Sequence, residues 1–146
     1  TMNHPEKAHF GNGELAWQLK ETKTIAETSG VLGVAEYGEA FDFPVKRIFY
    51  LTNIQKDAVR GCHAHADLHQ LVLCLSGSFE ISLDCGINKA TYAMCHSGQS
   101  LYLDGRVWRE MRHFSRDAVM LVLCDREYRY DDVVRDYKTF KSNLKL

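Results

Sequence analysis

The chain has 146 residues, 45% of them hydrophobic and 25% charged, which is ordinary composition for one globular domain. Its formal net charge of -1 argues against a general nucleic-acid binder. No apolar stretch approaches the ~20 residues of a membrane span, so we expect a cytoplasmic protein that does not bind membranes. The five cysteines include no Cys-x-x-Cys pair, which argues against a disulfide framework or a thiolate zinc site.

Short strand-like runs dominate the chain after a polar N-terminal segment, residues 1–12, that we expect to be loose. In residues 78–83 the apolar side chains of Phe79, Ile81 and Leu83 alternate with polar ones, which is typical of an antiparallel sheet with one buried face. Closely spaced strands with turn signals predict a sandwich or barrel. The strands are expected at residues 47–51, 68–75, 78–83, 100–103 and 118–124.

Only the C-terminus has a helical pattern. Val133, Tyr137, Phe140 and Leu144 follow at steps of four, three and four, and Asp131 or Asp132 could cap the helix. We expect this helix to pack on the outside of the barrel. No repeat or linker interrupts the chain, so residues 1–146 are predicted to form a single all-β domain with a C-terminal helix.

The most informative segment is residues 60–70, which contain His63 and His65. Residues two apart on a strand point to the same face, so both imidazoles are expected to face one space. The alternative is a pair of surface histidines, but the flanking glycine and the apolar run that follows favour a barrel wall. Two imidazoles in one cavity suit proton transfer at neutral pH.

This segment resembles the first cupin motif, which implies a jelly-roll barrel. Gln70 stands at the position of the usual glutamate ligand, and Arg109 stands at that of the histidine of the second motif. Glutamine is a weak metal ligand and protonated arginine cannot coordinate, so no metal or other cofactor is expected. A metal site would need His69, Asp67 or Glu110 to replace the missing ligands.

Four ordered motifs together are similar to the dTDP-4-keto-6-deoxyglucose 3,4-ketoisomerases. They are residues 46–50, 60–65, 68–78 and 107–111, and the similarity runs from about Ile25 to Phe140. The resemblance implies a homodimeric enzyme that uses no metal and takes a dTDP-linked keto-sugar toward 3-amino-3,6-dideoxyhexoses. It implies that a base removes the proton at C3, that an enediolate forms, and that a proton returns at C4.

We assign the principal base to His63, a relay or hydrogen-bonding role to His65, and stabilisation of the oxyanion to Arg109. The two histidines could exchange roles, and Arg109 could instead be a surface residue paired with Glu110. Within the resemblance, arginine at position 109 favours the gluco product over the galacto epimer. Ser29 lies where the second discriminating residue is expected, and it matches neither type.

The remaining substrate-binding candidates are Arg47, Arg60, Gln70, Tyr102 and Trp108. Arg47 and Arg60 could pair with the pyrophosphate or form structural ion pairs. Tyr102 and Trp108 could stack on thymine or belong to the core.

Three other functions remain open at this point. They are a metal-dependent cupin dioxygenase, a non-catalytic sugar-nucleotide-binding cupin, and the 3,5-epimerase of rhamnose synthesis. The epimerase would pair its base histidine with an aspartate and use a tyrosine as acid, and the sequence alone places neither residue.

Overall fold

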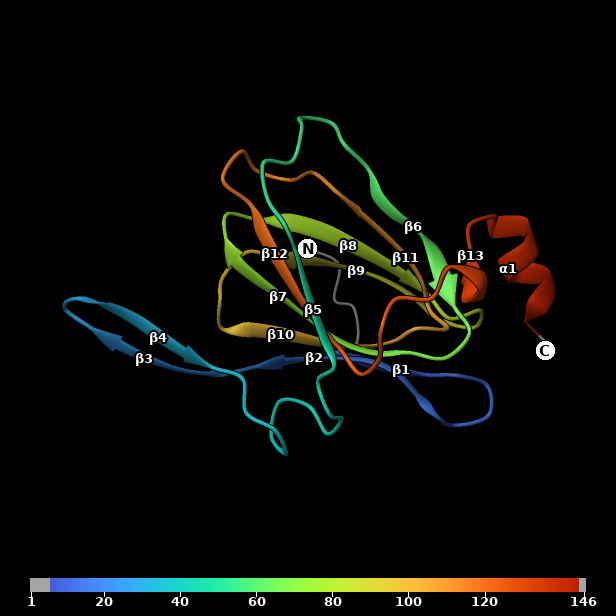
Figure 1. Ribbon diagram of the computed structural model, residues 1–146, viewed down its shortest axis with the longest axis horizontal. Helices are drawn as coiled ribbons and strands as arrows, with labels where there is room; N and C mark the ends of the chain where they lie inside the picture. Colours follow the sequence, from blue (N-terminus) through green and yellow to red (C-terminus); the bar gives the residue numbers. More distant parts are fainter. Residues whose placement is uncertain (1–5, 145–146) are drawn as a thin grey trace.

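The computed structural model describes residues 6–144, which form two facing antiparallel sheets and a projecting hairpin (Figure 1). The six-stranded sheet has the order β1-β2-β10-β7-β12-β5, with β1 (Lys7–His9), β2 (Leu15–Glu21), β10 (Gln99–Asp104), β7 (His69–Ser76), β12 (Val119–Cys124) and β5 (Arg47–Leu51). The five-stranded sheet has the order β13-β6-β11-β8-β9, with β13 (Val133–Val134), β6 (Arg60–His65), β11 (Trp108–Arg112), β8 (Phe79–Asp84) and β9 (Lys89–Met94). The hairpin consists of β3 (Lys23–Glu27) and β4 (Gly30–Val34).

The core lies between the two sheets, where their inward faces meet. On β8, Phe79, Ile81 and Leu83 are each at most 2% exposed, which confirms the face predicted from their alternation. Trp17 enters from β2, and its Nε1 donates a hydrogen bond of 3.0 Å to the hydroxyl of Tyr92 on β9. The prediction of an all-β fold is confirmed.

The N-terminal segment differs from the expectation where it is described. Residues 7–9 form β1 and pair with β2, so this part is ordered rather than loose. Ala8 explains the order, because its side chain is buried in the core. Residues 1–5 lie outside the described range.

The C-terminal helix is shorter than predicted, and neither Asp131 nor Asp132 caps it. Those two residues belong to a short 3-10 helix, η1 (Tyr130–Asp132), and the next two form β13 beside β6. Valine favours a strand, so the chain is held in the sheet until α1 (Tyr137–Asn143) begins. Asp136 is the actual cap, accepting a hydrogen bond of 3.0 Å from the Thr139 backbone. As predicted, α1 packs on the outside of the sheet, through the buried Phe140.

The hairpin of β3 and β4 extends away from both sheets (Figure 1). All but one of its strand residues are exposed, including Val31 and Leu32, which are 62% and 58% exposed. Exposed apolar side chains on a protruding hairpin favour a partner surface over solvent. No helix among residues 6–144 is long and apolar enough to span a membrane.

Candidate active site

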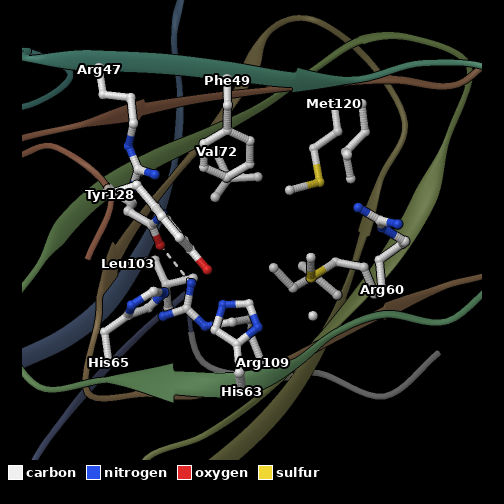
Figure 2. Close-up of a pocket in the computed structure, with 15 residues that line it drawn as sticks. Arg47, Phe49, Arg60, His63, His65, Val72, Leu103, Arg109, Met120 and Tyr128 are labelled. Carbon is white, nitrogen blue, oxygen red and sulfur yellow. Dashed lines mark hydrogen bonds between the residues drawn. The ribbon is translucent and has the colours of Figure 1, made fainter. Parts of the chain in front are cut away.

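A cavity of about 220 Å³ opens between the two sheets, and most of its wall is apolar. His63, His65 and Arg109 lie together at one end of it, while Arg47 and Arg60 reach it from other sides (Figure 2). A largely apolar pocket with a few converging polar groups is the usual form of a small-molecule site. The lining residues are Arg47, Phe49, Leu51, Arg60, Gly61, His63, His65, Gln70, Val72, Ile81, Leu103, Arg109, Met111, Met120 and Tyr128.

The two histidines share one face of β6, as their spacing predicts. Their ring centroids lie 4.8 Å apart, with the ring planes nearly perpendicular. Just before them, Gly61 and Cys62 both have positive φ, and Cys62 is the extra residue of a β-bulge opposite β11. Bulges next to active sites redirect side chains, and this one sets the direction in which His63 enters the cavity. The alternative of two surface histidines is wrong.

Both imidazoles have a low affinity for protons. Burial lowers the pKa of His63 to about 4, helped by the nearby Arg109 cation and opposed by the backbone of Gly61. Burial likewise lowers the pKa of His65 to about 3, with Arg109 and then His63 adding to the effect. At pH 7 both side chains are therefore neutral, and each keeps a nitrogen that can accept a proton.

Arg109 is a buried cation at the end of the cavity, only 4% exposed. Its guanidinium donates to Gln70 Oε1 at 2.5 Å and to the backbone oxygens of Asp104, Gly105 and Val107 at 3.1 to 3.3 Å. Burial lowers its pKa to about 10, so it remains charged at pH 7. Because these direct acceptors are all neutral, the buried charge is left for an anion that enters the cavity.

Glu110 does not pair with Arg109, which rules out the surface ion pair considered from the sequence. The Glu110 carboxylate instead accepts hydrogen bonds from Trp108 Nε1 and from Arg112. Gln70 also lines the cavity, and its hydrogen bond orients the Arg109 guanidinium.

Arg47 and Arg60 also reach the cavity, from opposite sheets. The Arg47 guanidinium lies 5.5 Å from the ring centroid of Phe49 and 5.5 Å from that of Tyr128. Arg60 is exposed on the other side of the cavity, near Met120 (Figure 2). Neither arginine forms a carboxylate ion pair within residues 6–144, so both are available to a phosphate-bearing ligand.

Three of the predicted substrate-binding residues lie outside this cavity. Trp108 packs against Tyr137 and Phe140 beneath α1, on the face of β11 opposite to Arg109. Tyr102 lines the outer side of the six-stranded sheet, where its hydroxyl lies 2.7 Å from Nδ1 of His69. Ser29 lies in the turn of the hairpin, which projects away from the sheets (Figure 1). Neither Trp108 nor Tyr102 therefore faces this cavity, and their stacking on thymine stays a prediction.

Sequence reasoning missed two residues that the fold brings to the histidines. Asp132 lies beside His65, with its Oδ1 3.5 Å from the imidazole Nδ1. Tyr128 follows β12 and extends into the cavity beside Arg47 (Figure 2). Asp132 was visible only as a possible helix cap, and the sequence around Tyr128 carries no pattern that marks a pocket residue.

The side chains that could have completed a metal site are engaged elsewhere. His69 contacts Tyr102 on the outer face, Asp67 accepts a hydrogen bond from Arg126, and Glu110 binds Arg112. Across residues 6–144 no three histidine, cysteine or carboxylate side chains converge in a way that could hold a metal ion. The donor set in the cavity, with glutamine and arginine at the ligand positions, does not suit a metal.

Comparison with known proteins places the chain in a family. Its sequence matches the FdtA family, described as WxcM-like, C-terminal, over residues 16–145. It is 35% identical over 122 residues to the TDP-4-oxo-6-deoxy-alpha-D-glucose-3,4-oxoisomerase of Aneurinibacillus thermoaerophilus, covering 84% of this chain and 88% of the relative.

Solved structures of ketoisomerases share the fold. One is a histidine-to-asparagine mutant of the 3,4-ketoisomerase QdtA from Thermoanaerobacterium thermosaccharolyticum in complex with TDP-4-keto-6-deoxyglucose, with a TM-score of 0.83, 33% identity and coverage of 88% of this chain and 94% of that one. Another is a 3,4-ketoisomerase from Helicobacter canadensis, with a TM-score of 0.83, 30% identity and coverage of 93% and 98%. The resemblance seen in the sequence motifs is thus confirmed, and the chain belongs to the FdtA family of WxcM-like proteins.

Proposed function

We propose that His63, His65 and Arg109 move the keto group of a dTDP-linked 4-keto-6-deoxyglucose from C4 to C3. The chain is a TDP-sugar 3,4-ketoisomerase, as its relative and structural neighbours are. The observation that carries the mechanism is the meeting of two neutral imidazoles and one buried arginine in a single cavity.

The reaction needs a base, a stabiliser for a negative oxygen, and a proton donor. Neutral His63 takes the proton from C3, and the electron pair moves toward the C4 carbonyl to give an enediolate. Arg109 stabilises the charge on that oxygen, in a site where burial strengthens the interaction. A proton then returns to C4, from His63 or through His65, while the C3 hydroxyl passes its proton to the oxygen on C4, so that C3 bears the new carbonyl and C4 bears the hydroxyl. No redox partner is needed, because the sugar is oxidised at C3 and reduced at C4.

Arg47 and Arg60 hold the nucleotide diphosphate in this proposal. Both line the cavity, and arginine can bind phosphate oxygens in a bidentate manner. Binding energy from the nucleotide would fix the sugar against the histidines without touching the reacting atoms.

For the product, we propose the gluco epimer, dTDP-3-keto-6-deoxy-D-glucose. Arg109 supports it, since it stands at the position that distinguishes the two types within the resemblance. The face from which C4 receives its proton decides between gluco and galacto. His63 and His65 line one wall together, which is consistent with delivery from one face only.

A second candidate is a 3,5-epimerase, because the structure supplies the aspartate and tyrosine that such an enzyme would use. Asp132 lies beside His65, and Tyr128 enters the same cavity. An epimerase would exchange the proton at C5 as well as that at C3 and would leave the carbonyl at C4. Proton exchange at C5 and the position of the carbonyl therefore distinguish the two reactions directly.

The experiment that tests the function is turnover of dTDP-4-keto-6-deoxyglucose by chelator-treated protein in deuterated buffer, followed by NMR. We expect a 3-keto sugar with deuterium at C4, at a rate unchanged by chelation, because the cavity lacks a suitable metal donor set. Deuterium at C5 with the carbonyl still at C4 would establish the epimerase instead. A need for added iron or manganese would contradict the mechanism, and binding without turnover would indicate a binding module.

We also propose that the enzyme is a cytoplasmic homodimer in which the exposed hairpin packs against a second copy. Ile25, Val31 and Leu32 on the hairpin are 40% to 62% exposed, and Ile48 and Tyr50 on the edge strand β5 are 55% and 67% exposed. An unpaired edge strand and apolar patches of this kind are usually covered in an assembly. The five free thiols suit a reducing compartment. Since Ser29 lies in the turn of the hairpin, in the proposed dimer it would lie near the second copy and could approach the cavity of that copy.

Light scattering of the purified chain tests the dimer. For the unmodified chain we expect twice the chain mass of 16.7 kDa. For Leu32→Asp we expect the measured mass to fall toward that of one chain. The matched control is Ile87→Asp, since Ile87 is 54% exposed but lies outside the hairpin and β5. A monomeric unmodified chain, or the same mass for both variants, would contradict this assembly.

A further inference from the structure

Asp132 stands out because one of its carboxylate oxygens, Oδ1, is buried beside His65. This Oδ1 forms no hydrogen bond with any residue that the structure describes, and it lies 3.5 Å from Nδ1 of His65. The side chain of Asp132 is only 18% exposed. A buried carboxylate oxygen without a donor is costly, so its place beside a single imidazole calls for an explanation.

The backbone holds Asp132 in that place from both sides. Its carbonyl oxygen accepts a hydrogen bond of 3.1 Å from the backbone of Ala66, which follows His65. The next residue, Val133, pairs directly with His65 in the β13–β6 register. The side chains of Asp132 and His65 therefore meet because of the sheet, and a small rotation closes the gap to hydrogen-bonding distance. Catalytic hydrogen bonds are often long in unliganded structures and tighten with substrate.

We propose that Asp132 is a positioning residue that accepts a hydrogen bond from Nδ1 of His65 and so leaves Nε2 as the nitrogen that exchanges a proton with the sugar. The proposal rests on the ketoisomerase function and refines the role of His65 within it. A neutral imidazole carries one proton, and a carboxylate at Nδ1 keeps it there. No carboxylate among residues 6–144 pairs with His63, whose ring contacts the Gly61 backbone instead.

The charges around His65 give Asp132 a second effect. Arg109, Arg47, Arg135 and His63 all act against a positive charge on this imidazole. Asp132 is the anionic side chain in contact with it. When Nε2 takes up a proton in the reaction, the Asp132 carboxylate offsets the repulsion from these neighbouring groups. It thereby stabilises the His65 imidazolium for the time that the enediolate exists. His65 can then receive and return the proton, while His63 starts the reaction at C3.

The test compares Asp132→Asn with Asp131→Asn, a matched control in the same 3-10 helix whose side chain is exposed. We expect Asp132→Asn to lower kcat by about 10- to 100-fold with KM nearly unchanged, as loss of a partner that orients a functional histidine does elsewhere. Asp131→Asn should match the unmodified enzyme. Asp132→Glu, which keeps the carboxylate, should recover part of the lost kcat.

A nitrogen NMR measurement separates this role from a merely structural one. In the unmodified protein without substrate, His65 should carry its proton on Nδ1, and in Asp132→Asn the proton should move toward Nε2. A proton on Nε2 in the unmodified protein would overturn the proposal, even if Asp132→Asn failed to fold. An unchanged kcat together with an unchanged tautomer in the folded variant would overturn it as well. Absence of ketoisomerisation by the unmodified protein would instead refute the function, since the tautomer is read without substrate.

Discussion

Replacing His63 with asparagine is expected to lower kcat by about 100- to 10,000-fold, the range over which a positioned general base contributes. Asparagine keeps much of the size and polarity of the side chain, but it cannot take a proton from C3 at neutral pH. KM should change little, because in the proposed binding mode Arg47 and Arg60 bind the nucleotide and His63 does not. Steady-state kinetics of 3-keto sugar formation measure both parameters.

The matched control is His113→Asn. His113 is an exposed histidine with φ of 57°, a left-handed conformation that asparagine tolerates well. Its loss should leave kcat unaltered. If His65→Asn proved far more damaging than His63→Asn, the two histidines would exchange their roles, and a loss of less than tenfold in both would refute histidine catalysis.

The pH dependence of kcat/KM provides a second check on the histidines. Burial and Arg109 lower the pKa of His63 to about 4, below the ordinary value of 6.5. The neutral, basic form of His63 therefore persists as the pH falls from 8 through 6.5, and activity should decline only as the pH approaches the lowered pKa. A decline centred near pH 6.5 would indicate that the base is solvated and lies outside the buried cavity.

The sequence was sufficient to find the histidine pair because a strand imposes a two-residue period. His63 and His65 face one cavity for the same reason that Phe79, Ile81 and Leu83 face the core. The same period applied to β11 separates Arg109 from Trp108, because neighbouring residues of a strand point to opposite faces. The period therefore places Trp108 on the face of β11 that turns away from the cavity.

Other features depended on contacts between distant segments. Asp132 could be read from the sequence as a helix cap, since an aspartate before an apolar period is a normal start signal. Pairing of Val133 and Val134 with β6 overrode that signal and carried Asp132 to His65. The β-bulge at Cys62 likewise arises from its register with β11, which no local pattern reveals.

Arg109→Gln is expected to lower kcat by about 100- to 1,000-fold, the usual effect of losing one preorganised donor to a developing oxyanion. Arg109 is fixed by four hydrogen bonds to neutral acceptors, so its charge is already oriented before substrate enters. Glutamine removes that charge and shortens the side chain, while Arg109→Lys keeps the charge but loses the planar fork. The lysine variant should therefore lie between the glutamine variant and the unmodified enzyme.

Loss of Arg109 also leaves Gln70 Oε1 and three backbone oxygens without this donor, so stability has to be measured separately. Thermal unfolding and the affinity for dTDP show whether the Arg109→Gln variant keeps its fold and its nucleotide site. Arg112→Gln is the matched control, because Arg112 lies three residues further along β11 and pairs with Glu110 outside the cavity. If Arg109→Gln folds, binds dTDP normally and keeps kcat within about threefold of the unmodified enzyme, a stabilising role worth several kcal/mol is refuted. The charge on the enediolate would then have to be balanced by the remaining polar groups of the cavity, Tyr128 first among them.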